Sequence, residues 1–137
     1  MSQRFKFNIP ENYAVDLEYE PELDGVVFSG PNGIIEIAFQ YLDGRTIAES
    51  IKGFLDGIEV PFEMISEVEQ INIDKLEGCC CRYAVEGEYT YEIDLGIDVP
   101  DACYGEDVLS ILLASDNKEN LEALEKDVNI AALVKVC

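Results

Sequence analysis

The chain has 137 residues and a mass of 15.3 kDa, which predicts one domain spanning residues 1–137. Its 29 Asp and Glu residues outnumber nine Lys and Arg residues, and the net charge of −20 argues against binding to nucleic acid or to an anionic membrane. The chain has no histidine, which excludes histidine-based catalysis and histidine metal sites.

The first third of the chain is predicted to form an antiparallel meander of short strands. Apolar and polar residues alternate in short runs, and Gly and Pro separate the runs. The strands are expected at residues 5–9, 14–19, 26–28 and 34–41, with turns at Asp24-Gly25 and at Gly30-Pro31-Asn32-Gly33.

A helix is predicted after this meander. Thr46 and Glu49 have the spacing of a capping box, in which each side chain accepts a hydrogen bond from the backbone N–H of the other residue. Apolar residues then recur at helical spacing, at Ile47, Ile51, Phe54 or Leu55, and Ile58. Gly57 and Pro61 mark the end of the helix.

The middle of the chain is predicted to be extended. Residues 64–74 form one strand, a turn near residues 76–78 leads into residues 79–85, and Gly87 turns the chain into residues 89–95. In the last strand, one face is expected to be buried and the other to face water. The buried face carries Tyr89, Tyr91, Ile93 and Leu95, and the wet face carries Thr90, Glu92 and Asp94.

The last third supplies the remaining elements. Residues 107–114 are apolar on both faces, which predicts a central strand covered on both sides. Asp116 or Asn117 caps a second helix, whose buried stripe is Leu121, Leu124 and Val128. Residues 130–136 fit either a strand or a helical tail. The predicted fold is therefore α+β and sandwich-like, with an antiparallel sheet of about six to seven strands flanked by two main helices.

The cysteines allow two interpretations. Five cysteines cannot all pair within one chain, and a strand at this position places Cys79 and Cys81 on one face and Cys80 on the other. A thiol-based metal or redox role, completed by Cys103 or Cys137, is one interpretation. The other interpretation is that the cysteines are buried, reduced side chains. We favour it because the chain has no C-x-x-C pair and no histidine.

Acidic residues gather between residues 94 and 107. The group consists of Asp94, Asp98, Asp101, Glu106 and Asp107, and the glycines and proline among them predict a loop. A small hydrolase or isomerase that uses these carboxylates is one alternative, and a weak cation site is another. The spacing of an EF-hand is absent, so we favour a solvated loop and expect no metal and no cofactor.

Tyrosines lie in or beside the predicted hairpin, at Tyr83, Tyr89, Tyr91 and Tyr104. Tyrosine is enriched at protein interfaces, so these residues are candidates for partner binding, with Asp98, Asp101 and Glu106 as an acidic rim. The alternative is that the tyrosines cover a helix-packed face of the sheet. Exposure distinguishes the two interpretations.

The order of elements resembles that of the PsbP-like fold, which the extrinsic P protein of photosystem II shares with a nuclear-import factor that binds the Ran GTPase. The likeness covers the opening Phe7-Asn8-Ile9-Pro10 with Tyr13, although Asn12 stands where the family often has glycine and Tyr13 where tryptophan is common. It extends over residues 33–41 and a following helix, residues 71–78 before a hairpin, and residues 108–115 before the helix at 119–127. The resemblance implies an antiparallel sheet flanked by helices, adaptor roles and no common active site, and it assigns no functional residue here.

We therefore expect an acidic domain that binds a protein partner and has no catalytic activity of its own. The negative charge favours a partner with a basic surface. No apolar stretch is long enough for a signal peptide or a membrane span, which predicts a cytoplasmic location.

Overall fold

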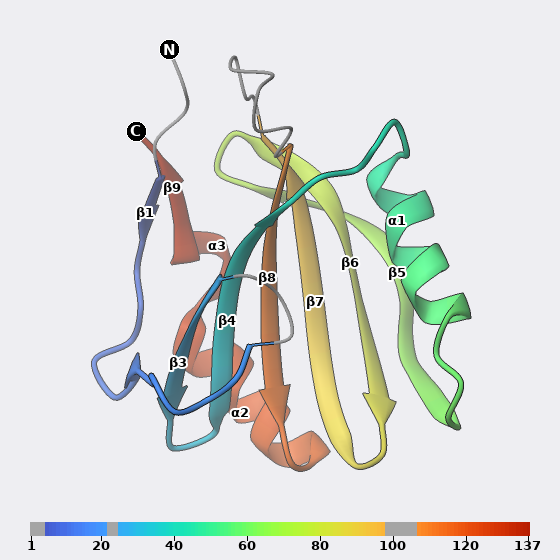
Figure 1. Cartoon of the computed structure of the whole chain (residues 1–137). Helices are drawn as coiled ribbons and strands as arrows, with labels where there is room; N and C mark the ends of the chain where they lie inside the picture. The colour runs from blue at the N-terminus through green and yellow to red at the C-terminus, as the bar shows by residue number, and fades with distance from the viewer. Residues whose placement is uncertain (1–4, 22–24, 98–106) are drawn as a thin grey trace.

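The computed structural model describes residues 5–21, 25–97 and 107–137 (Figure 1). The strands are β1 (Phe5–Phe7), β2 (Ala14–Val15), β3 (Gly25–Gly30), β4 (Gly33–Gln40), β5 (Phe62–Ile73), β6 (Leu76–Val85), β7 (Glu88–Gly96), β8 (Val108–Ser115) and β9 (Val134–Val136). The helices are α1 (Ile47–Asp56), α2 (Lys118–Val128) and α3 (Ile130–Leu133).

Within these ranges, seven strands form one antiparallel sheet in the order β2-β3-β4-β8-β7-β6-β5, and β1 pairs separately with β9. Figure 1 shows α1 on one face of the large sheet, over its β5 and β6 side, and α2 on the other face. This arrangement confirms the predicted α+β fold, with a seven-stranded antiparallel sheet and two main helices.

Alternation along each strand divides the apolar residues between the two faces. On the α2 face, Ile93 of β7 and Ile111 of β8 pack with Leu124 of α2 in the larger core. On the α1 face, Ile51 of α1 packs with Tyr83 of β6 in a smaller core. We call these two sides of the sheet the α2 face and the α1 face.

The predicted helix and central strand are confirmed. Thr46 and Glu49 make both hydrogen bonds of the capping box at the start of α1. Asn117 caps α2 by accepting a hydrogen bond from the Asn120 N–H, and Leu121, Leu124 and Val128 are buried as predicted. Strand β8 lies in the middle of the sheet, and all its residues are buried.

Several predicted boundaries were wrong. The strand expected at residues 14–19 ends at Val15. The Asp16 carboxylate there accepts hydrogen bonds from the backbone N–H groups of Glu18 and Tyr19 and from the Ser29 hydroxyl, which turns the chain out of the strand. The turn expected near residues 76–78 lies at Asp74 and Lys75. Asp74 takes the positive φ of 54°, and Leu76 is already buried and paired in β6.

The two ends of the chain pair with one another. Strand β1 lies beside β9 instead of joining the meander, because Phe5 is opposite Val136 and Phe7 is opposite Val134. The segment at 130–136, for which the sequence allowed either form, contains both the short helix α3 and the strand β9. The turn predicted at Asp24-Gly25 begins outside the described residues.

The predicted wet face of β7 was the most consequential error. Thr90, Glu92 and Asp94 expose only 7, 8 and 6% of their surface. Polar alternation indicated a solvent-facing side, but β7 lies inside the sheet and α1 passes over the same face. A sequence pattern cannot reveal such a cover, because the helix that provides it comes from a distant part of the chain.

In the described ranges, none of the three helices is long and apolar enough to cross a membrane.

Candidate functional site

The structure separates the tyrosines that the sequence grouped. Tyr83 is buried on the α1 face, where its hydroxyl donates a hydrogen bond to Glu92 Oε1 at 3.2 Å. Tyr91 is buried on the α2 face, and Tyr89 is half-buried against the same core. These three side chains therefore do not form one surface. Tyr104, Asp98, Asp101 and Glu106 lie outside the described residues.

Tyr91 belongs to a packed polar cluster. The guanidinium of Arg82 lies over its ring, 3.9 Å from the ring centre, and forms an ion pair with Glu125 of α2. The Nε and Nη2 atoms of Arg82 both donate to the Glu125 carboxylate. Burial raises the pKa of Tyr91, so its hydroxyl stays protonated at neutral pH. The cluster ties α2 to β6 and β7 and has a structural role.

Exposed and half-buried apolar side chains lie together at the β2 edge of the large sheet. Six residues of β1 to β4 form this area, which we call the edge patch: Phe5, Phe7, Val15, Val26, Phe28 and Phe39. Val15 is opposite Phe28 and Val26 is opposite Ile37, so the strand residues share the α2 face. The ring of Phe39 lies 6.2 Å from that of Phe5, which joins the two sheets across the patch.

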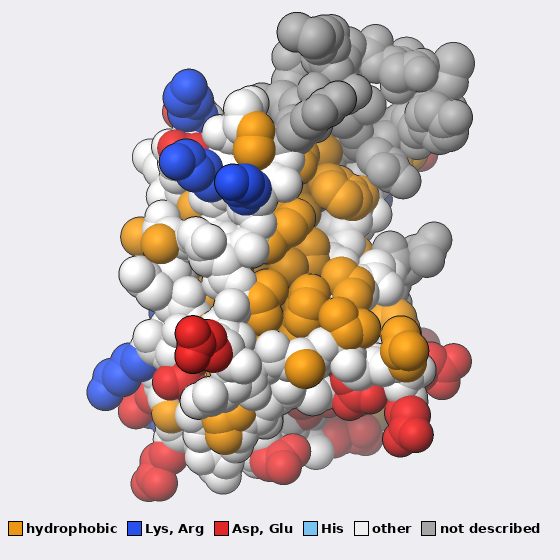
Figure 2. All heavy atoms as spheres, turned by 90° about the vertical axis from the view of Figure 1, so that its left-hand side faces the viewer, with side chains coloured by type: hydrophobic (Ala, Val, Ile, Leu, Met, Phe, Trp, Pro, Cys, Tyr) orange, Lys and Arg blue, Asp and Glu red, His pale blue; other side chains and the backbone are white. Residues whose placement is uncertain are grey.

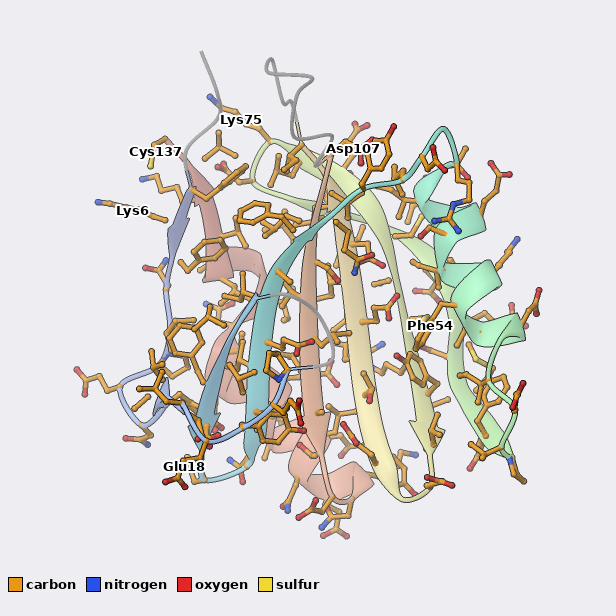
Figure 3. The ribbon with its side chains drawn as sticks, in the orientation of Figure 1. Lys6, Glu18, Phe54, Lys75, Asp107 and Cys137 are labelled. Atoms are coloured by element: carbon orange, nitrogen blue, oxygen red, sulfur yellow. The ribbon has the colours of Figure 1, made fainter. Side chains whose placement is uncertain are left out.

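The edge patch is bordered by charges of both signs. Figure 2 shows a continuous apolar area on this side of the molecule, with Lys and Arg side chains near its top and Asp and Glu side chains near its bottom. In Figure 3, Lys6 and Lys75 lie near one end and Glu18 near the other. Lys6 is directly opposite Lys135 in the β1–β9 pair. This lysine end is a local exception in a chain of charge −20.

A row of buried polar side chains crosses the α1 face. It consists of Glu36 on β4, Ser110 on β8, and Thr90, Glu92 and Asp94 on β7. Leu112 lies between Glu36 and Glu92 in register, and Asp94 is directly opposite Ser110. From the sequence, Asp94 was expected on the wet face of the strand at 89–95 and at the start of the acidic group at 94–107. The structure places it within β7, as expected, but buries it.

Asp94 is the most unusual member of this row. In the described part of the chain, Asp94 Oδ1 and Ser110 Oγ are buried without a hydrogen-bond partner. Burial raises the pKa of the Asp94 carboxyl, and the nearby Glu92 and Ser110 side chains offset only part of that effect. A carboxyl in such a position is costly for the fold unless a proton or a cation neutralises it.

A small pocket opens beside this carboxyl. Its volume is about 120 Å³, and we call it the carboxylate pocket. Glu92, Asp94 and Leu112 line it from the sheet, Ser50, Ile51 and Phe54 line it from α1, and Gln40 completes it. Phe54 is about half exposed, and Figure 3 shows it on the side of α1 that faces the sheet. The pocket thus has a carboxylate interior, apolar walls and an aromatic residue near solvent.

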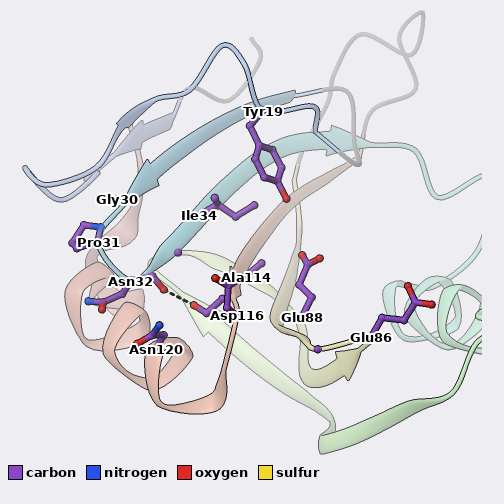
Figure 4. A pocket seen from close by; sticks show the side chains of 13 residues that line it. Tyr19, Gly30, Pro31, Asn32, Ile34, Glu86, Glu88, Ala114, Asp116 and Asn120 are labelled. Atoms are coloured by element: carbon purple, nitrogen blue, oxygen red, sulfur yellow. Dashed lines mark hydrogen bonds between the residues drawn. The ribbon is translucent and has the colours of Figure 1, made fainter.

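A larger and more open pocket lies at the far end of the sheet (Figure 4). Its volume is about 420 Å³, and Tyr19, Ile34, Glu88 and Asp116 are among the residues that line it. The Ser115 hydroxyl there donates to the carbonyl of Asn32 at 2.6 Å, which joins β8 to the turn between β3 and β4. The described lining residues include no Lys or Arg, and Asp116 is exposed, so nothing in this pocket singles out a reacting group.

The cysteine cluster has the predicted alternation. Cys79 and Cys81 lie on the α1 face, opposite Asp94 and Glu92, and Cys80 lies opposite Ile93 on the α2 face. Burial raises the pKa of Cys81 to about 12 and also raises that of Cys79. Both thiols are therefore protonated at neutral pH, which makes them poor nucleophiles and poor metal ligands.

Metal binding finds no support in the described ranges, where no three His, Cys, Asp or Glu side chains are grouped so that they could hold an ion. The acidic segment at 94–107 is described only at its ends. There, Asp94 is buried and Asp107 accepts a hydrogen bond from the Leu42 N–H at 2.9 Å. Asp107 thus helps to fix the segment that follows β4.

Comparison with models of known protein families and with curated protein sequences finds no match for this chain. The resemblance to the PsbP-like fold stays a prediction.

Proposed function

We propose that this chain is a binding domain without catalytic activity, and that it docks a basic protein partner through the edge patch. The observation that carries the proposal is the exposure of neighbouring apolar residues. Val15, Val26 and Phe39 expose 52, 37 and 39% of their surface on one side of the sheet. Contiguous apolar areas with a charged border are typical of protein interaction sites.

The charge of the chain favours a partner of opposite sign. A second copy would also carry −20, so long-range repulsion opposes self-association, and nucleic acid or an anionic membrane is repelled in the same way. A protein with a basic border around an apolar surface is attracted at long range and then held by apolar contact. The lysine end around Lys6 and Lys135 would meet an acidic spot on that partner and fix its orientation.

The same proposal includes a cytoplasmic location. Cys79, Cys80, Cys81 and Cys137 are free, which agrees with a reducing compartment.

The test is photo-crosslinking followed by an affinity measurement. A photoreactive phenylalanine replaces Val26 in one variant and Val60 in another, and each variant is irradiated in a lysate of the host cell. Val60 is the matched control, since it is exposed to a similar degree, 39%, but lies after α1 and away from the patch. The captured protein is then purified, and its binding to the unmodified chain is measured by calorimetry at low and high salt.

We expect one basic partner to be captured from position 26 and not from position 60. Val26→Asp should weaken its binding at least tenfold, Val60→Asp by less than twofold, and high salt should weaken binding to the unmodified chain. Equal loss from both variants, an acidic partner, or crosslinking of the chain to a second copy would each contradict the proposal.

A further inference from the structure

The carboxylate pocket contains an acidic group that the fold itself does not satisfy. Asp94 is 6% exposed, and its Oδ1 has no hydrogen-bond partner among the described residues although it lies in the wall of a cavity. The ion pair between Arg82 and Glu125 lies on the other face of the sheet. Among the described residues, no Lys or Arg forms an ion pair with Asp94.

Burying an unpaired carboxylate is unfavourable relative to leaving it in water. Burial raises the pKa of the Asp94 carboxyl, and below that raised pKa a proton neutralises the group. A ligand that brings its own positive charge and hydrogen-bond donors replaces the proton, because it restores both the charge balance and the missing contact.

We propose that the carboxylate pocket binds a primary alkylammonium group, with the ammonium against Asp94 and the alkyl chain against Ile51, Phe54 and Leu112. The proposal is independent of the proposed function, since the pocket lies on the α1 face and the edge patch on the α2 face.

The lining favours this chemistry over other cations. An ammonium has three N–H donors, and the oxygens of Asp94, Glu92 and either Gln40 or Ser50 supply acceptors in the same pocket. Three of the lining side chains are apolar, which suits an alkyl chain and not a hydrated metal ion. The ring of Phe54, which is about half exposed, adds an apolar contact for the alkyl chain. A guanidinium needs both oxygens of a carboxylate in its plane, whereas Asp94 has one oxygen without a partner.

At a pH where Asp94 is protonated in the free chain, binding releases a proton. The alkylammonium keeps its own charge, and the proton that leaves the Asp94 carboxyl passes to solvent. The titratable groups around Asp94 are Glu92 on its own strand, Cys79 and Cys81 on β6, and Glu36 on β4 beyond Leu112, with Lys52 of α1 near Cys79. Both thiols have raised pKa values, so the carboxyl groups are the source of the released proton.

An alkylammonium group reaches such a pocket from two sources, as a free amine or as the lysine side chain of a protein. The volume of about 120 Å³ is well above the roughly 10–15 Å³ that a cavity needs to admit one water molecule, so the pocket has room for a short alkylammonium group. The two sources are distinguished by comparing n-propylammonium with a short peptide that has one central lysine, and with the same peptide carrying arginine.

The experiment is an NMR titration of the whole chain with n-propylammonium at neutral pH, followed through backbone amide shifts. The neutral isostere n-propanol is the ligand control. Asp94→Asn is the test variant. Asp56→Asn is the matched control, because it removes the same charge from the exposed side of α1. Ser110→Ala tests the cross-strand neighbour of Asp94 without changing charge.

We expect saturable shifts at α1 and β7 with n-propylammonium and none with n-propanol. Asp94→Asn should weaken binding at least tenfold, and Asp56→Asn by less than threefold. Stronger binding of the lysine peptide than of the free amine assigns the site to a protein side chain, and weaker binding assigns it to a small amine. Equal binding of n-propanol, equal affinity of the Asp94→Asn chain, or preference for the arginine peptide would overturn the proposal.

Discussion

Asp94 and Ser110 are directly opposite one another on β7 and β8, in the centre of the sheet, and expose 6 and 1% of their surface. In the part of the chain that the structure describes, Asp94 Oδ1 and Ser110 Oγ nevertheless lack hydrogen-bond partners. Proteins rarely bury such groups without compensation. The pair therefore reduces the stability of the fold. Groups that bind ligands often reduce stability in this way.

The first prediction concerns Asp94 and pH. Because its pKa in the folded state is raised above the usual value of 3.8, the folded chain binds more protons than the unfolded chain just above that pH. Stability should therefore fall as pH rises through this window, and the penalty should be complete above the folded-state pKa. Asp94→Asn removes the penalty and should raise the Tm by a few degrees at neutral pH.

Thermal unfolding at several pH values measures this effect. The gain of Asp94→Asn should disappear below pH 3.8, where both states are protonated. Asp56→Asn, on the exposed side of α1, should show no comparable gain. An Asp94→Asn chain that is less stable than the parent at neutral pH would show that the carboxylate is satisfied in a way that the structure lacks.

A second prediction tests the cluster that holds α2 to the sheet. Arg82→Ala should cost about 2 kcal/mol, because it removes both the ion pair with Glu125 and the contact with the Tyr91 ring. Glu125→Ala should cost about 1 kcal/mol, and the double variant should reveal a coupling of roughly 1 kcal/mol. Urea unfolding of the parent, the two single variants and the double variant gives these values. If the loss of stability in the double variant equals the sum of the two single losses, the pairing is refuted.

The third prediction concerns Gly78, which allows β6 and β7 to approach closely. A Cβ at this position would lie 1.8 Å from the backbone oxygen of Asp94, so Gly78→Ala must displace a strand. We expect a loss of about 2–4 kcal/mol. Gly57→Ala is the matched control. Gly57 has a φ of −81° and its nearest neighbour atom would lie at 3.4 Å, so alanine should be neutral or slightly stabilising. Similar urea midpoints for the two variants would contradict this account.

The fourth prediction ranks the thiols. Cys137 is exposed, Cys79 is half-buried with a raised pKa, and Cys80 and Cys81 are buried. In a Cys103→Ser background, a disulfide reagent at neutral pH should modify Cys137 quickly and Cys79 slowly. All four thiols should react after unfolding. Rapid modification of Cys81 in the folded chain would show that α1 does not cover β6 as described.

Local signals identified most of the elements. The capping box of Thr46 and Glu49, the stripe of Leu121, Leu124 and Val128, and the apolar run of β8 each depend on neighbours in sequence, and all three were predicted correctly. The pairing of β1 with β9 was not predicted, because it joins the two ends of the chain and depends on contacts that no local pattern encodes.

The candidate sites were harder to foresee than the fold. Alternation along β7 assigned Thr90, Glu92 and Asp94 to one face correctly, but the exposure of that face was wrong because α1 covers it. The sequence did single out Tyr83, whose hydroxyl donates a hydrogen bond to Glu92 of this row, though as a candidate surface residue. Val15 and Val26 were not recognised as an exposed area, because they come from different strands that only the register brings together.

The most direct test of the account is the pKa of the Asp94 side chain, measured by carbon NMR with and without n-propylammonium. The account predicts a titration midpoint above 3.8 in the free chain and a lower midpoint when the amine is bound, since the ammonium stabilises the carboxylate. A free-chain midpoint at or below 3.8, or one that the amine leaves unchanged, would contradict the claim that the fold holds an unpaired carboxyl for a cationic ligand.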